Sequence, residues 1–152
     1  MSTALSSPRV LVGGELVGND LTPDVVDPST GEVLLTVPRA TRSQAEAAVA
    51  GAKAAYPAWR ATSAERRTAV NRFADVIEKH RDELAAMLVR EQGKPLSQAK
   101  DEIDSTSGFV RADARIDLPV EVVHEDDDFR MEVHQRHVGV VVGMGPGTSR
   151  SS

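Results

Sequence analysis

The 152-residue sequence contains no cysteine. These residues can therefore form no disulfide bond, no Cys-ligated zinc site and no thiol nucleophile. Aromatic residues make up only 3% of the chain, so a core drawn from its 40% of hydrophobic residues should consist mainly of Ala, Val and Leu. Long hydrophobic runs are also missing, because the longest, Val138 to Val142, is interrupted by Gly139 and is far too short to span a membrane.

Concentrated positive charge is lacking as well. The net charge is -5, and Arg and Lys form no basic stripe, which argues against nucleic acid as the main partner. The opening stretch, Met1 to Pro8, is small and polar, so no secretory signal is visible. We therefore expect a cytoplasmic protein without membrane or nucleic-acid partners. The one dense charged run, Glu125 to Asp128, is typical of a solvated turn between two strands.

The first forty residues have the pattern of short strands and turns. Residues 1–8 indicate a disordered tail, and residues 10–17 indicate a hairpin of two short strands around Gly13-Gly14. The run Asp27 to Glu32 contains Pro and Gly and predicts a turn. A strand over residues 33–37 follows it.

Helix signals dominate the middle of the chain. Ser43 to Glu46 and Thr62 to Glu65 both have the spacing of a capping box, in which a hydroxyl precedes an acid by three residues. Pro57 should end the first helix, and Gly93 followed by Pro95 should end the third. These signals, with apolar residues at helical spacing, predict helices over residues 43–56, 63–79, 82–92 and 96–114.

Beyond Leu118 the hydrophobic period changes to two. Strands over residues 120–123 and 130–136 should form a second hairpin around the acidic turn. The run 138–143 is apolar on both faces, as in a strand buried within a parallel sheet. A parallel strand needs parallel partners and crossover helices, which no later residue supplies. The sequence therefore predicts an incomplete α/β fold that consists of a hairpin, four helices, a second hairpin and one buried sheet strand.

Several short segments, taken together in order and spacing, resemble the NAD(P)-dependent aldehyde dehydrogenase superfamily from about Val10 to Pro146. Each segment alone is ordinary turn, cap or strand chemistry. The segments are Asp27-Pro28-Ser29-Thr30-Gly31-Glu32-Val33, Val37-Pro38, Ala55-Tyr56-Pro57-Ala58-Trp59-Arg60, Ser63-Ala64-Glu65-Arg66-Arg67, Arg90-Glu91-Gln92-Gly93-Lys94-Pro95-Leu96 and Val138-Gly139-Val140-Val141-Val142-Gly143.

The resemblance implies the N-terminal part of a dinucleotide-binding domain. It divides the chain into a tail (1–8), a family portion (9–146) and an out-of-frame or disordered end (147–152). The strand 138–143 would be the first of the nucleotide-binding sheet, and the hairpin around Asp126 would belong to an oligomerisation arm, since family members are homo-oligomers. The resemblance also implies that Met144, Gly145 and Pro146 line NAD or NADP through their backbone in intact relatives, although only Pro146 matches the motif.

The resemblance further implies a catalytic Cys, a general-base Glu and an Asn that donates to the oxyanion. None of these is present in its family context, and Thr148 stands where the Asn should be. Glu91 and Glu102 are not expected to act as general bases, and the four histidines lack metal-ligand spacing. We therefore expect no catalytic or metal-binding residue, no productive cofactor binding and no activity from this truncated aldehyde dehydrogenase. The alternative is a helical module that docks on full-length subunits and modulates their assembly.

The last residues suggest an origin for the departure from the family pattern. The family motif continues Trp-Asn-Phe-Pro after the residue equivalent to Pro146. With GC-rich codons, which the 14 Arg against 4 Lys favour, loss of the first base of that motif turns it into Gly-Thr-Ser-Arg, the residues at 147–150. We therefore expect a one-base shift after the Pro146 codon, with the family sequence continuing in another frame of the DNA.

Overall fold

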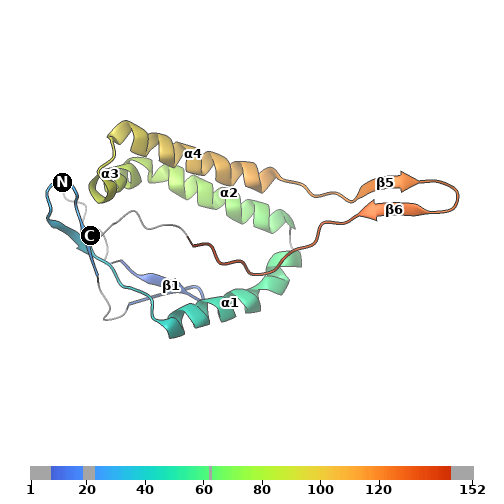
Figure 1. Cartoon of the computed structure of the whole chain (residues 1–152), viewed down its shortest axis with the longest axis horizontal. Coiled ribbons are helices and arrows are strands. Elements are labelled where there is room, and N and C mark those ends of the chain that lie inside the picture. Colours follow the sequence, from blue (N-terminus) through green and yellow to red (C-terminus); the bar gives the residue numbers. More distant parts are fainter. Residues whose placement is uncertain (1–7, 19–22, 62, 145–152) are drawn as a thin grey trace.

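The computed structural model describes residues 8–18, 23–61 and 63–144. Within these ranges the strands pair only as three separate antiparallel hairpins, β1–β2, β3–β4 and β5–β6. Figure 1 shows α2, α3 and α4 side by side, α1 beside β1, and β5–β6 projecting from the body. In chain order the elements are β1 (Val10–Val12), β2 (Glu15–Val17), β3 (Asp24–Val26), β4 (Val33–Thr36), α1 (Arg42–Ala61), α2 (Ser63–Lys79), α3 (Arg81–Gln92), α4 (Leu96–Arg115), β5 (Glu121–Glu125) and β6 (Arg130–Val133).

The core lies between α2, α3 and α4. Its buried side chains are Ile77, Ala85, Ala99 and Ile103, and Leu88, Val89 and Val110 pack against them. Alanine, leucine and valine take part in this core, as the composition predicted, but the two largest buried side chains are isoleucines, which we did not expect. None of the described helices is long and apolar enough to cross a membrane.

Three of the four predicted helices have nearly the predicted bounds. Helix α2 spans 63–79 as expected, and α3 and α4 are each one residue longer than the predicted 82–92 and 96–114. The αL conformation of Gly93, with φ of 71°, ends α3 as predicted, and its N–H donates to the Val89 carbonyl. Helical periodicity and the glycine at the end of α3 therefore predict most of the bounds of this helical layer.

Helix α1 differs from the prediction at both ends. Its capping box is Thr41–Gln44, not Ser43–Glu46: the Thr41 N–H donates to Gln44 Oε1 at 2.9 Å, and the Gln44 N–H donates to Thr41 Oγ1 at 3.2 Å. The helix also continues through Pro57 to Ala61. The second predicted box begins at Thr62, which lies outside the described residues.

A contact from the next helix supports the extension of α1 beyond Pro57. The guanidinium of Arg66, in the first turn of α2, donates to the carbonyls of Trp59 at 2.7 Å and Arg60 at 2.9 Å. Carbonyls in the last turn of a helix have no intrahelical partner, so these bonds stabilise a turn that Pro57 would otherwise leave weak. Residues from a different helix therefore set this boundary.

The strand predictions are partly confirmed. The hairpin over residues 10–17 and a strand from Val33 are present, as are strands on either side of the acidic turn, with β5 running to residue 125 and β6 ending at 133. Strand β3 was missed. It contains only three residues, between Pro23 and Asp27-Pro28, and gains its ladder from β4, where Val25 faces Leu35. Too little of β3 is periodic for the sequence pattern to reveal it.

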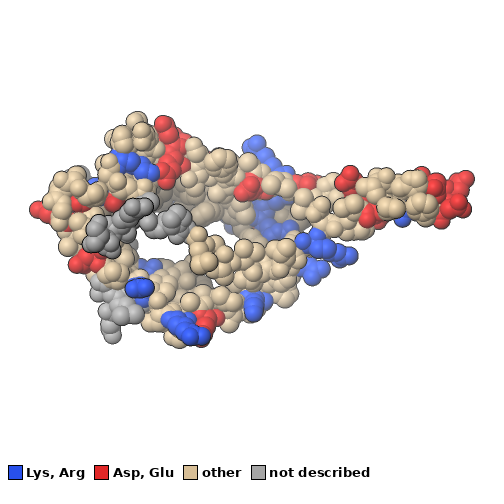
Figure 2. All heavy atoms as spheres, viewed as in Figure 1, with Lys and Arg blue, Asp and Glu red and all other residues tan. Residues whose placement is uncertain are grey.

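The acidic run forms the turn between β5 and β6, as expected. Figure 2 shows Asp and Glu side chains gathered over the far end of the projecting hairpin, and Asp126, Asp127 and Asp128 are all exposed. Asp126 organises the turn, because its carboxylate accepts hydrogen bonds from the N–H groups of Asp128 and Phe129. The run is therefore a solvated turn, held by one of its own side chains.

The predicted buried strand over 138–143 is not formed, and this prediction is corrected. No residue of this segment is in a strand, and Val138, Val141 and Val142 are 88%, 73% and 66% exposed. A buried strand requires hydrogen-bonded neighbours on its edges and cover on its faces. Among the residues that the structure describes, no strand pairs with this segment, and only Gly139 and Val140 within it are partly buried.

Two of the sequence motifs pack against each other. The β3–β4 turn lies against the C-terminal end of α3, where a Cβ on Gly93 would approach Pro28 Cγ to 3.1 Å. Asp27 is buried in this turn, where it accepts hydrogen bonds from the N–H and hydroxyl of Ser29 and pairs with Arg90 at 3.7 Å. The turn motif and the helix-end motif therefore form one joint.

We predict that Gly93→Ala destabilises the chain by about 1–2 kcal/mol, because an L side chain is strained in the αL conformation, with a further steric cost against Pro28. Gly108→Ala is the matched control. Gly108 lies exposed within α4, and a Cβ added to it would have open space within 4 Å, so this change should stabilise by about 0.5–1 kcal/mol. Urea unfolding followed by circular dichroism measures both, and equal stability of the Gly93 variant and the parent would contradict the joint.

Candidate functional site

Of the three predicted cofactor residues, the structure describes only Met144. Met144 is the last described residue and is 92% exposed. Gly145 and Pro146 lie outside the described residues. Their predicted backbone contact with NAD or NADP therefore remains a prediction.

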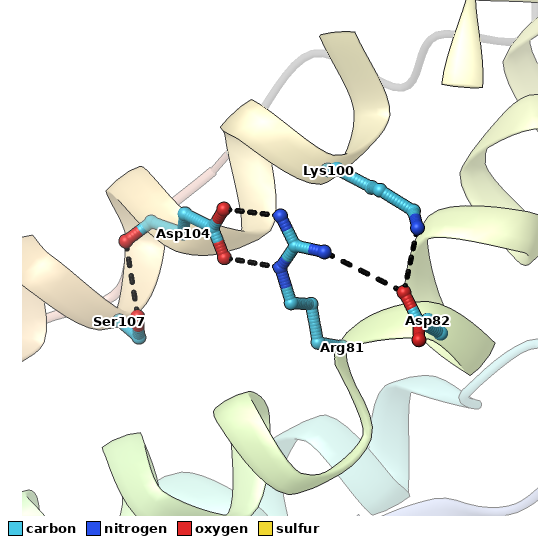
Figure 3. Close-up of polar contacts among 5 residues, drawn as sticks. All are labelled: Arg81, Asp82, Lys100, Asp104 and Ser107. Carbon is cyan, nitrogen blue, oxygen red and sulfur yellow. Dashed lines mark hydrogen bonds and ion pairs between the residues drawn. The ribbon is translucent and has the colours of Figure 1, made fainter. Parts of the chain in front are cut away.

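The most connected polar group is a network between α3 and α4 (Figure 3). The guanidinium of Arg81 donates to both carboxylate oxygens of Asp104, and Lys100 Nζ lies 2.9 Å from Asp82 Oδ1. Arg81 also reaches Asp82 at 3.5 Å, which joins the two pairs. Ser107 is buried and donates its hydroxyl to the backbone carbonyl of Asp104 at 3.0 Å, so it holds the helix turn that presents this carboxylate.

These contacts lower the pKa values of both carboxyls, Asp104 and Asp82. The hydrogen bond from Arg81 lowers the pKa of Asp104, and the hydrogen bond from Lys100 lowers the pKa of Asp82. Both carboxyls are held ionised and paired with cations on the neighbouring helix. A general base needs a pKa near the working pH and an open approach for substrate, so this network is suited to joining helices, not to proton transfer.

A second charged group joins α2 to α4. Arg111 Nη2 donates to Asp75 and Glu78, each at 2.7 Å, and its Nε donates to Glu78 at 3.0 Å. These bonds raise the pKa of Arg111 and lower that of Glu78. The guanidinium lies over the α2–α4 interface and fixes the register of the two helices.

The other candidate acids and histidines are separated or individually paired. Glu91 is exposed on α3, and Glu102 pairs with Lys94. Each of three histidines contacts one carboxylate: His80 with Glu83, His124 with Asp126 and His134 with Glu132. In the part of the chain that the structure describes, no three His, Asp or Glu side chains converge in a way that could hold a metal ion.

The lowered pKa of Asp104 predicts a specific acid sensitivity. A carboxyl whose folded-state pKa is depressed stabilises the fold above its ordinary value of 3.8, and this stability is lost as the pH falls through the folded-state pKa. Asp104→Asn should therefore lose less stability than the parent between about pH 5 and about pH 2. Thermal melts across this range measure the effect. Asp127→Asn, in the exposed turn, is the control and should follow the parent; identical acid profiles for all three proteins would rule out this role of Asp104.

Comparison with known proteins identifies a match over most of the chain. The model of the aldehyde dehydrogenase family matches residues 17–146. A glutarate-semialdehyde dehydrogenase of Pseudomonas putida is 33% identical over 132 residues, 84% of this chain and 28% of the relative. An N-succinylglutamate 5-semialdehyde dehydrogenase of Chromohalobacter salexigens is 35% identical over 142 residues, which is 91% of this chain and 29% of the relative.

Solved structures agree with the sequence comparison. A succinate-semialdehyde dehydrogenase from Burkholderia pseudomallei superposes with a TM-score of 0.70 at 35% identity, over 79% of this chain and 26% of that one. An NAD-dependent benzaldehyde dehydrogenase from Corynebacterium glutamicum gives a TM-score of 0.69 at 28% identity, over 81% of this chain and 28% of that one. The chain spans less than a third of the length of these relatives. With a family match from residue 17 to 146 and the same arrangement of helices and hairpins, the chain belongs to the aldehyde dehydrogenase family.

Proposed function

We propose that these 152 residues form a non-catalytic, N-terminal part of an NAD(P)-dependent aldehyde dehydrogenase and do not oxidise aldehydes by themselves. The absence of cysteine carries this proposal. Oxidation by this family's chemistry requires a thiolate that attacks the carbonyl before hydride leaves, and then a base that activates water for release of the acid. The chain matches less than a third of its relatives' length, which supports the proposal that the catalytic residues lie in another part of the family's fold.

The surface supports a scaffold role for the helical layer. Large apolar side chains are exposed on it, among them Phe73 at 59% on α2 and Phe109 at 71% on α4. The segment after β6 adds Val138 and Val141, which are more exposed still. Apolar surface of this extent is typical of an interface with further protein. We propose that the catalytic part of the family's fold covers it and pairs with residues 138–143.

Cofactor binding belongs to the same proposal. Among the similar structures, one is an NAD-dependent benzaldehyde dehydrogenase and another is an NADP-dependent enzyme of Escherichia coli, so both nicotinamide cofactors occur among the neighbours. We propose that Met144, Gly145 and Pro146 run beside the cofactor when residues 138–143 are paired in a complete sheet.

The purified chain should therefore give no aldehyde-dependent reduction of NAD or NADP. The measurement is the absorbance of reduced nicotinamide with aliphatic, aromatic and acid-semialdehyde substrates. The P. putida glutarate-semialdehyde dehydrogenase is the positive control. Reduction above the protein-free blank that depends on both the aldehyde and this chain would refute the proposal.

The alternative, a helical module that docks on full-length subunits, has one observation in its favour. All nine residues of β5 and β6 are exposed, and this hairpin projects from the body (Figure 1), where another protein could reach it. A two-stranded hairpin is marginally stable alone, so a partner would stabilise it. The two proposals make different demands. The docking module requires a stable monomer and no family sequence in another frame of the adjacent DNA, whereas the truncated dehydrogenase requires that family sequence to be there.

A further inference from the structure

We propose that a cavity at the base of the β5–β6 hairpin binds a small organic monoanion with an apolar body, such as an aromatic monocarboxylate. The cavity has a volume of about 470 Å³, within the range of about 300–1,000 Å³ usual for small-molecule sites. Its wall comes from five places in the chain: the end of α1, the start of α2, the end of α4, residues 116–118 and residues 135–137. The hypothesis goes beyond the proposed function, because it requires no catalysis and no nicotinamide cofactor.

Three arginines and two aspartates set the charge of the wall. Arg67 pairs with Asp117 at 3.1 Å, which neutralises both groups. Arg66 and Arg136 remain against Asp113, which leaves one net positive charge. A single anionic group on the ligand balances this charge, whereas a neutral ligand leaves it unbalanced and a dianion exceeds it.

Arg136 is the cation best suited to meet the ligand. The two hydrogen bonds from Arg66 to the α1 carbonyls of Trp59 and Arg60 both use its Nη1, so this part of the guanidinium is already engaged at the helix end. Arg136 makes no ion pair with any carboxylate of the described residues. A guanidinium presents two parallel N–H donors to a carboxylate, which matches the geometry of a planar monocarboxylate.

The rest of the wall is apolar and one part of it is aromatic. Val70, Ile116 and Leu118 line the cavity, and the ring of Trp59 lies on the same wall. Trp59 is 49% exposed, so it has a free face for a flat ligand. Because a ligand there would gain apolar burial as well as an ion pair, a carboxylate with an aromatic body fits the cavity better than a small inorganic anion.

Trp59 is the only tryptophan in the sequence, so its fluorescence reports on this cavity alone. The test titrates the full chain with benzoate, with benzyl alcohol as the uncharged match in size. We expect a saturable change with benzoate and a response at least tenfold weaker with benzyl alcohol. A linear or absent response to benzoate, or equal responses to the two compounds, would overturn the proposal.

Arg136→Gln should weaken benzoate binding by roughly tenfold, the usual effect of removing one charge-assisted hydrogen bond. Arg72→Gln is the matched control, because Arg72 is exposed on α2 and is not part of the cavity wall. It should bind benzoate as the parent does. Circular dichroism verifies that both variants retain their helices, and equal loss of binding in the two variants would overturn the assignment of Arg136.

Discussion

The packing of α2 and α3 against α4 is the interaction on which the other described parts depend. Ile77 on α2 and Ile103 on α4 bury their side chains in the small core, with Ala85 and Ala99 between the helices. A fully buried aliphatic side chain contributes about 1.5–3 kcal/mol, whereas an exposed ion pair contributes little because water screens it. The apolar seam therefore supplies the stability, and the arginine pairs at its rim set the register.

The more distant parts attach to this layer through single joints. Pro28 lies on Gly93, so the β3–β4 turn is positioned by the end of α3. Arg66 caps α1 from α2 and thereby joins the N-terminal half to the layer. The β5–β6 hairpin and residues 138–144 have no comparable anchor in the core, which agrees with their exposure. Stability should consequently decrease from the helical layer toward both of these segments.

The sequence predicted much of what local chemistry determines, although it placed the α1 capping box at Ser43–Glu46 and not at Thr41–Gln44. It missed what residues of other elements determine. The bounds of α2, α3 and α4 follow from nearby periodicity and from a glycine end signal at Gly93, and the family followed from motif order. The true end of α1 depends on Arg66, and β3 depends on a partner strand, so neither was visible locally. The same holds for the charged pairs: Arg81 meets Asp104 across 23 residues and Arg111 meets Glu78 across 33. The strand expected at 138–143 was inferred from its composition, but a strand forms only where partners exist.

Hydrogen exchange followed by mass spectrometry on the purified chain tests the central claim, that a self-contained helical layer carries an apolar segment lacking its partners. Peptides from α2 and α4 should exchange slowly, because their amides open only when the core opens. Peptides covering residues 138–144 should exchange fast and without protection. Protection of residues 138–143 equal to that of α4 would contradict this claim, because the segment would then be paired and covered within this chain.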